Sequence, residues 1–185
     1  MPDTKLPVAI VAAAGFVEQN LTNTQKFLIA AGLPFHVITP EGALVQGWHE
    51  NAWGHHFMAD EKLSDVISAD YCGLILLDGR NSTDSLVVNA HAKRLVKAFM
   101  DADKPVLAID EAIRILLAAE VAAGRKVAAP EALRSAAIRD GAQTIEGETL
   151  VIDNNLVTAT AEANTIARLE AFVDLLDKGA VQQAA

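Results

Sequence analysis

Apolar residues follow two different patterns along the chain. Short continuous apolar runs, such as VAIV at residues 8–11 and VLAI at residues 106–109, are typical of strands that are buried on both faces. Longer segments, such as residues 162–177, carry apolar residues three and four positions apart and indicate amphipathic helices. Strands that alternate with helices in this way predict a parallel sheet covered by helices on both faces.

The predicted strands are residues 7–12, 35–39, 73–77, 106–109, 126–128 and 156–158. The predicted helices are residues 18–31, 84–100, 111–119, 131–139 and 162–177. Two segments interrupt the alternation. Residues 43–57 carry two Trp, three His and two Gly and are expected to form a β-hairpin or an extended excursion, and residues 145–155 carry the turn residues of a second hairpin.

The composition describes a chain that can bury one core. Of its 185 residues, 51% are hydrophobic, and we expect a single domain over residues 1–179 with a frayed tail over residues 180–185. The net charge is -9, and no cluster of Lys and Arg interrupts it. A net negative charge without a basic cluster argues against a nucleic-acid partner and against an anionic membrane partner.

The cysteine count and the N-terminal residues bear on the compartment. The single cysteine, Cys72, excludes an intrachain disulfide and fits a reducing environment. Pro7 and Gly15 flank the first apolar run and favour a buried strand over a signal peptide, and no stretch of 18 apolar residues occurs. We therefore expect a cytoplasmic protein.

Asp110 lies at the junction of the predicted strand 106–109 and the predicted helix 111–119, with no loop between them. A side chain at such a turn points over the end of the sheet, into the crevice where open α/β proteins bind ligands. An Asp there also caps free helix N–H groups and tolerates a positive φ. A structural role and a chemical role for Asp110 therefore carry similar weight.

The order of elements resembles that of the DJ-1/PfpI (ThiJ) superfamily, which is related to the class I glutamine amidotransferases. The segments that carry the resemblance are VAIVAAAGFVEQNL (8–21), ITPEGALVQGW (38–48), WGHHFMADEKLSDVISADYCGLILLDGR (53–80), KPVLAIDEAIRILLAAEVAAGRKV (104–127) and NNLVTA (154–159). The resemblance implies a flavodoxin-like three-layer α/β sandwich with a mostly parallel central sheet and a β-hairpin excursion. It also implies a homodimer at least.

The positions that carry the chemistry of that family hold other residues here. Asp110 stands where members have the nucleophilic Cys, and Glu111 stands where many have His. Asn20 corresponds to the last Glu of the opening motif, and Asp78 to the first Gly of a Gly-Gly pair, which leaves Gly79. Since a thiolate mechanism needs a low-pKa sulfur at the turn, we expect no Cys-dependent glyoxalase, deglycase or peptidase activity.

These replacements suggest that Asp110 and Asn20 imitate an oxidised form of the parent site. A carboxylate has the geometry of a cysteine sulfinate, with two oxygens on one atom attached to Cβ. Two neighbouring carboxylates would repel, whereas the Asn20 amide can donate a hydrogen bond to Asp110. We expect a hydrogen bond between the two side chains.

Four further residues are candidates for binding a small-molecule ligand: Asp78, Gly79, Glu18 and His49. Gly79 permits close backbone approach, and its amide could bind an anion. Glu18 is otherwise an ordinary first-turn acid of the helix that begins there. The sequence thus favours a non-catalytic binding or stress-associated protein.

The alternative is a hydrolase or lyase that uses Asp110 as nucleophile or acid/base. A nucleophilic Asp needs a His to activate water, and the candidates are His49, His55 and His56. Because His55 and His56 are adjacent on a predicted strand, at most one of them would face the site. A further alternative is a divalent cation held by Asp78, Asp110 and Glu111 with a nearby His, but no ligand spacing is diagnostic, and we expect neither a metal nor a cofactor.

Overall fold

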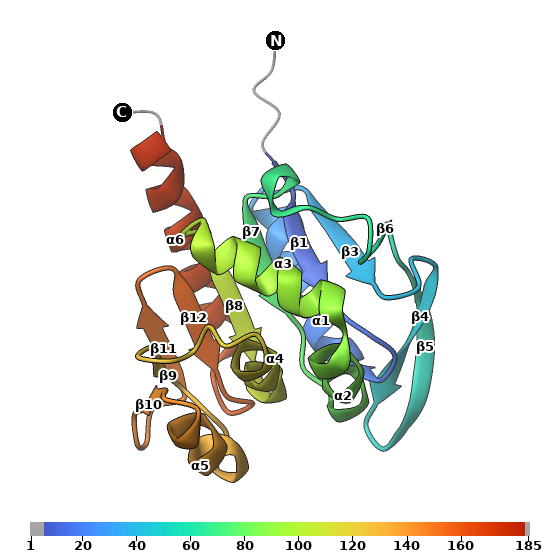
Figure 1. The fold of residues 1–185 in the computed structure, drawn as a ribbon. Helices are drawn as coiled ribbons and strands as arrows, with labels where there is room; N and C mark the ends of the chain where they lie inside the picture. The colour runs from blue at the N-terminus through green and yellow to red at the C-terminus, as the bar shows by residue number, and fades with distance from the viewer. Residues whose placement is uncertain (1–5, 184–185) are drawn as a thin grey trace.

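The computed structural model describes residues 6–183, with side chains described through residue 179. Its centre is a seven-stranded sheet in the order β11, β12, β8, β7, β1, β3, β6 (Figure 1). The bounds are β1 Val8–Val11, β3 Phe35–Thr39, β6 Glu61–Lys62, β7 Gly73–Leu76, β8 Val106–Ile109, β11 Leu150–Asp153 and β12 Leu156–Ala159. All neighbours in this sheet are parallel except β11 and β12. The predicted mostly parallel α/β fold is confirmed.

Helices cover both faces of the sheet because the strands are apolar on both sides. The helices are α1 Glu18–Ala30, α2 Arg80–Val88, α3 Ala90–Asp101, α4 Ile113–Ala118, α5 Glu131–Arg139 and α6 Thr165–Gln183, with the 3-10 turns η1 Ser68–Asp70 and η2 Asp110–Ala112. Along β1, Ile10 packs with Leu21 of α1 and Phe172 of α6, whereas Val11 packs with apolar residues of α2, α3 and α4. This produces two separate cores, one on each face.

The predicted excursion at residues 43–57 is an antiparallel hairpin of β4 Leu44–His49 and β5 Ala52–Met58. It is attached to the rest of the chain by β2, Phe16–Val17, which pairs in parallel with β4. The second hairpin consists of β11 and β12, and its turn at Asn154 lies within the predicted residues 145–155. Two short strands, β9 Lys126–Val127 and β10 Gln143–Thr144, form a separate parallel pair.

Two helix predictions differ from the structure. The predicted helix 84–100 is two helices, because the side chain of Asn89 accepts hydrogen bonds from the first N–H groups of α3 and so starts a new helix. The last helix begins at Thr165, and its backbone continues to Gln183 through part of the predicted tail. Residues 184–185 lie outside the described residues. In the described part of the chain, no helix is long and apolar enough to cross a membrane.

Candidate functional site

Asp110 occupies the turn that the sequence predicts, as the first residue of η2 directly after β8. Its φ is 48°, in the left-handed region that Asp tolerates better than most residues. Its Oδ1 accepts a hydrogen bond from the backbone N–H of Ala161, over 3.0 Å, in the loop that follows β12. The carboxylate therefore joins the ends of two neighbouring strands.

The pKa of Asp110 is raised above its ordinary value. Burial is the main cause, and the negative charge of Glu162 adds to it. The N–H groups of Ala161 and Glu111 and the charge of Arg168 act in the opposite direction. Neither η2 nor α4 has a side-chain cap hydrogen bond, so the capping role considered from the sequence is not seen at this turn.

Asn20 does not form the hydrogen bond with Asp110 that the sequence suggested. Its Nδ2 donates to Asp78 Oδ1 over 2.6 Å, and its Oδ1 accepts from Arg168 Nη2 over 2.6 Å. Asn20 lies in the first turn of α1, Asp78 follows β7, and Arg168 lies in α6. The amide therefore bridges a buried carboxylate and a buried guanidinium, while the carboxylate of Asp110 is bonded to Ala161.

Charge is concentrated in this buried chain of side chains. Burial raises the pKa of Asp78 to about 6, the nearby charge of Asp110 also raises it, and Asn20 and Arg168 lower it. Arg168 is only 3% exposed, and its Nε has no hydrogen-bond partner in the described structure. Burial lowers the pKa of Arg168, which both carboxylates oppose. Thus one buried cation serves two carboxyl groups.

Sequence reasoning missed Arg168, although one signal was available. Arg168 lies four residues before Phe172 in the terminal helix, so it belongs to the face that packs against the sheet. A charged residue on such a face is rarely buried unless a partner is present. The carboxylates of Asp78 and Asp110 account for its position.

Gly79 and Glu111 lie near these residues but have structural contacts of their own. Gly79 has a φ of 119°, and a Cβ there would overlap the carbonyl oxygen of Gly15, which confirms the predicted close backbone approach. Glu111 forms an ion pair with Arg114, whose Nη1 lies 3.7 Å from its Oε2. The same Nη1 lies 2.7 Å from Asp84, so Glu111 belongs to a link between α4 and α2.

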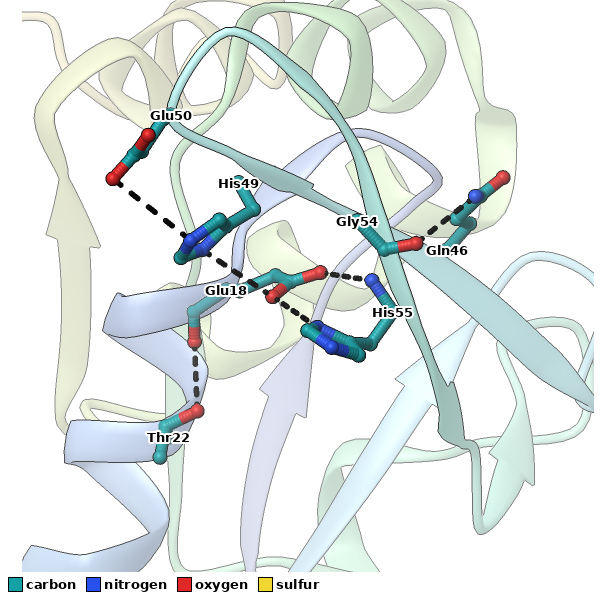
Figure 2. A network of polar contacts seen from close by, with 7 residues as sticks. All are labelled: Glu18, Thr22, Gln46, His49, Glu50, Gly54 and His55. Atoms are coloured by element: carbon teal, nitrogen blue, oxygen red, sulfur yellow. Dashed lines mark hydrogen bonds and ion pairs between the residues drawn. The ribbon is translucent and has the colours of Figure 1, made fainter.

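Glu18 and His49 meet in a second cluster, on the hairpin (Figure 2). Glu18 accepts a hydrogen bond from the backbone N–H of His55, and its Oε2 lies 3.0 Å from His55 Nδ1 and 3.7 Å from His49 Nδ1. Gly47 and Gly54 make room for the carboxylate, because a Cβ at either position would overlap Glu18. Glu18 therefore attaches the hairpin to α1, and His55 is the partner that sequence reasoning did not single out for it.

The pKa of Glu18 is lowered, in contrast to that of Asp78. Burial raises it, but the hydrogen bonds from His55 and the charges of His55 and His49 together lower it further. The two imidazoles remain largely in water, with side chains that are 59% and 80% exposed for His49 and His55. This cluster is thus a surface clamp with a buried carboxylate at its centre.

The histidines that the hydrolase alternative requires are elsewhere. His49 and His55 contact Glu18, whereas His56 lines a cavity on the other side of the hairpin, so adjacent histidines do point in opposite directions as predicted. No histidine among residues 6–183 forms a hydrogen bond with Asp110. In the same residues, no group of three or more His, Cys, Asp and Glu side chains is arranged to hold a metal ion.

Cys72 lies at the other end of the sheet from the crevice. It immediately precedes β7, whereas Asp78 follows that strand, and its Sγ lies 3.5 Å from the carbonyl oxygen of Pro7. The sulfur and Asp110 are therefore separated by the length of the strands between them, as the sequence indicated.

Comparisons with known proteins agree with this geometry. The DJ-1/PfpI family profile matches residues 7–174. The chain belongs to the DJ-1/PfpI family. It is 30% identical over 172 residues to General stress protein 18 of Bacillus subtilis, a match that spans 92% of this chain and 98% of that protein. It is 26% identical over 171 residues to Deglycase TK1284 of Thermococcus kodakarensis, spanning 92% of this chain and 99% of the relative.

Longer relatives and solved structures add to the family assignment. The chain is 34% identical over 111 residues to Protein DJ-1 homolog D of Arabidopsis thaliana, and that match covers 58% of this chain but only 28% of the plant protein. The crystal structure of a ThiJ/PfpI domain protein from Brachyspira murdochii superposes with a TM-score of 0.84 at 20% identity, over 94% of this chain and 98% of the other. This chain thus shares its α/β fold with that domain protein.

Proposed function

We propose that this DJ-1/PfpI protein is a non-catalytic, stress-associated binding protein whose ancestral nucleophile has been replaced by Asp110. One observation carries the proposal: Asp110, with a backbone φ of 48°, is the first residue of η2 and follows β8 directly. The cysteine of the chain precedes β7, at the opposite end of the sheet. The similarity to General stress protein 18 over nearly the full length of both chains supports the stress association.

The surroundings of Asp110 support binding over thiol-like chemistry. A nucleophilic Asp needs a His that activates water to hydrolyse the ester intermediate, whereas the described hydrogen bond to Asp110 Oδ1 comes from the backbone N–H of Ala161. The buried chain of Asp78, Asn20 and Arg168 holds the neighbouring strand ends in place. Asp110 therefore offers a small-molecule ligand a preorganised, negatively charged acceptor.

A homodimer is part of the same proposal. The family resemblance supports it, and so does the hairpin, where Trp53 and Leu44 are more than half exposed. Light scattering of the purified protein tests it, and a monomer at micromolar concentration would contradict it.

A hydrolase or lyase that uses Asp110 is the second candidate, and one observation favours it. The pKa of Asp78 is raised to about 6, and its charge is coupled to that of Asp110. A carboxyl group that titrates near neutral pH is suited to donate or accept a proton. In this candidate Asp110 would be the nucleophile, and Asp78 the acid/base beside it.

Two experiments test these candidates, and the first restores the family residues. The variant combines Asp110→Cys, Asn20→Glu and Asp78→Gly, and we expect a thiol whose alkylation by iodoacetamide remains fast below the ordinary cysteine pKa. The wild type should show no turnover of methylglyoxal, esters or peptides. Wild-type turnover that is lost in Asp110→Ala and kept in the surface control Asp140→Ala would overturn the proposal in favour of the enzyme.

A further inference from the structure

A cavity of about 300 Å³ lies at the carboxyl ends of β1 and β3. Asp78, Asn20, Asp110 and Arg168 are not among its lining residues. Its walls come from the loops after β1 and β3, from the hairpin and from α2, and the lining residues are Ala13, Ala14, Thr39, Pro40, Glu41, Leu44, Val45, Gln46, His56 and Ser85. Ligands of open α/β proteins bind in crevices beyond the carboxyl ends of the strands, and this cavity is in such a place.

The hairpin wall of the cavity is held in position from two sides. The N–H of Gly15 donates to the carbonyl oxygen of Gln46 over 2.8 Å, next to the parallel pairing of β2 with β4. On the other face of β5, Glu18 holds His55, the neighbour of His56 (Figure 2). The cavity is therefore formed by packed elements before a ligand arrives, which lowers the entropic cost of binding.

The polar side chains of the cavity include two acceptors, on Glu41 and Gln46, beside the Thr39 and Ser85 hydroxyls and the His56 imidazole. Glu41 forms no hydrogen bond or ion pair with the described residues, so its carboxylate is open to a ligand. The Gln46 amide nitrogen donates to the carbonyl oxygen of Gly54 over 3.1 Å, and Figure 2 shows its oxygen directed away from that bond. No Lys or Arg contributes to the lining. A ligand that carries a charged donor therefore meets an unpaired carboxylate and an amide oxygen at this site.

We propose that this cavity binds a small organic cation, namely a primary amine with a short apolar body. The ammonium group is held by the Glu41 carboxylate and the Gln46 amide oxygen, because an ionised donor and acceptor pair gives the strongest hydrogen bonds. Leu44, Val45 and Pro40 cover the apolar body. The net charge of -9 attracts cations to the protein at long range.

Titration with phenethylamine, followed through the backbone amide signals of the full chain by NMR, tests the proposal. We expect saturable shifts of Ala13, Ala14 and Gln46 at millimolar ligand, the affinity range of so small a molecule. The matched neutral ligand 2-phenylethanol should bind about tenfold more weakly, and phenylacetate should not shift these signals. Equal affinity for the amine and the alcohol, or no saturation, would overturn the proposal.

Three variants test whether phenethylamine binds in this cavity. Glu41→Gln should weaken phenethylamine about tenfold, while Glu146→Gln, which removes an exposed carboxylate near the opposite edge of the sheet, should leave the affinity unchanged. Ser85→Phe places a ring at the exposed α2 wall and should also abolish the shifts. Equal weakening by Glu41→Gln and Glu146→Gln, or shifts centred on the Ala161 loop, would contradict a site in this cavity.

Discussion

Glu18 and Asp78 are two carboxyl groups with equal exposure and opposite behaviour. Each residue is 6% exposed, yet the pKa of Glu18 is lowered whereas that of Asp78 is raised to about 6. Glu18 accepts hydrogen bonds from His55 and lies beside His49, while Asp78 accepts one from Asn20 and lies near the like charge of Asp110. Equal exposed area therefore does not mean an equal environment, because Glu18 lies close to the surface beneath two exposed imidazoles, whereas Asp78 lies deeper in the protein.

The pKa values of Glu18 and Asp78 shift in opposite directions because the groups around the two carboxylates differ. The side chains of His49 and His55, which contact Glu18, are mostly exposed, so water solvates both imidazoles next to the carboxylate. Asp78 shares a buried cation, Arg168, with a second carboxylate, and Arg168 itself loses hydration. Because one guanidinium is shared by two carboxylates, it offsets only part of the cost of burying their charges.

The largest effect is expected from Arg168→Leu. Removing the guanidinium leaves Asp78 and Asp110 without a cation and the Asn20 oxygen without its donor, which should lower the free energy of unfolding by about 3–5 kcal/mol. Urea denaturation measures the change. The control Arg139→Leu, at a side chain that is 75% exposed, should remain within about 0.5 kcal/mol of wild type. A loss below about 1 kcal/mol at Arg168 would show that the two carboxylates do not depend on it.

Asp78→Asn should raise stability at neutral pH. The folded pKa of about 6 lies above the ordinary 3.8, so this group stabilises the protein fully below pH 3.8 and loses that contribution as the pH rises through 6. At about 1.4 kcal/mol per pH unit, the interval corresponds to about 3 kcal/mol. Thermal unfolding from pH 4 to 8 should show the advantage of the amide growing up to about pH 6 and then levelling. An advantage that is independent of pH would contradict the buried titration.

Glu18→Gln should have the opposite sign at neutral pH. The lowered pKa of Glu18 means that its contribution is present above the ordinary value of 4.5 and is lost as the pH falls through the folded value. Loss of the charge-assisted hydrogen bonds to His55 should cost about 1 kcal/mol at pH 7, and the cost should shrink in acid. Hydrogen exchange should locate the loosening in the hairpin. If β4 and β5 exchange no faster than in wild type, Glu18 does not hold the hairpin.

The last prediction concerns Asp110, which lies near the charge of Arg168 but outside the hydrogen-bonded chain of Asp78, Asn20 and Arg168. Asp110→Ala removes the acceptor for the Ala161 N–H and places Ala at a φ of 48°, at a cost of about 1 kcal/mol in urea denaturation. Asp110→Asn keeps an oxygen and tolerates the same backbone conformation, so it should be nearly neutral. An Asn variant as unstable as the Ala variant would show that the charge, and not the hydrogen bond, holds this turn.

Much of the fold could be predicted from the sequence. The apolar runs located β1, β3, β7, β8 and β12 of the central sheet, because a strand buried on both faces is rich in apolar residues. The two edge strands, β6 and β11, were not predicted as strands, and β6 consists of the exposed residues Glu61 and Lys62. The break at Asn89 was hidden because the apolar periodicity continues across it, and only the cap hydrogen bonds distinguish two helices from one. The turn at Asp110 was predictable for a local reason, since a strand followed at once by a helix leaves one residue to change the chain direction.

The partners of the buried polar groups were decided by the tertiary structure alone. Asn20 is 58 residues from Asp78 and 148 residues from Arg168 along the chain, and Glu18 is 37 residues from His55. Periodicity assigns a side chain to a face of a helix or strand, which is enough to place it near several polar groups at once. A hydrogen bond forms only within about 3 Å of one of them, so packing of the elements selects Asp78 over Asp110 for Asn20. The sequence by itself thus determined where charge gathers in this protein, and the tertiary structure determined which charges meet.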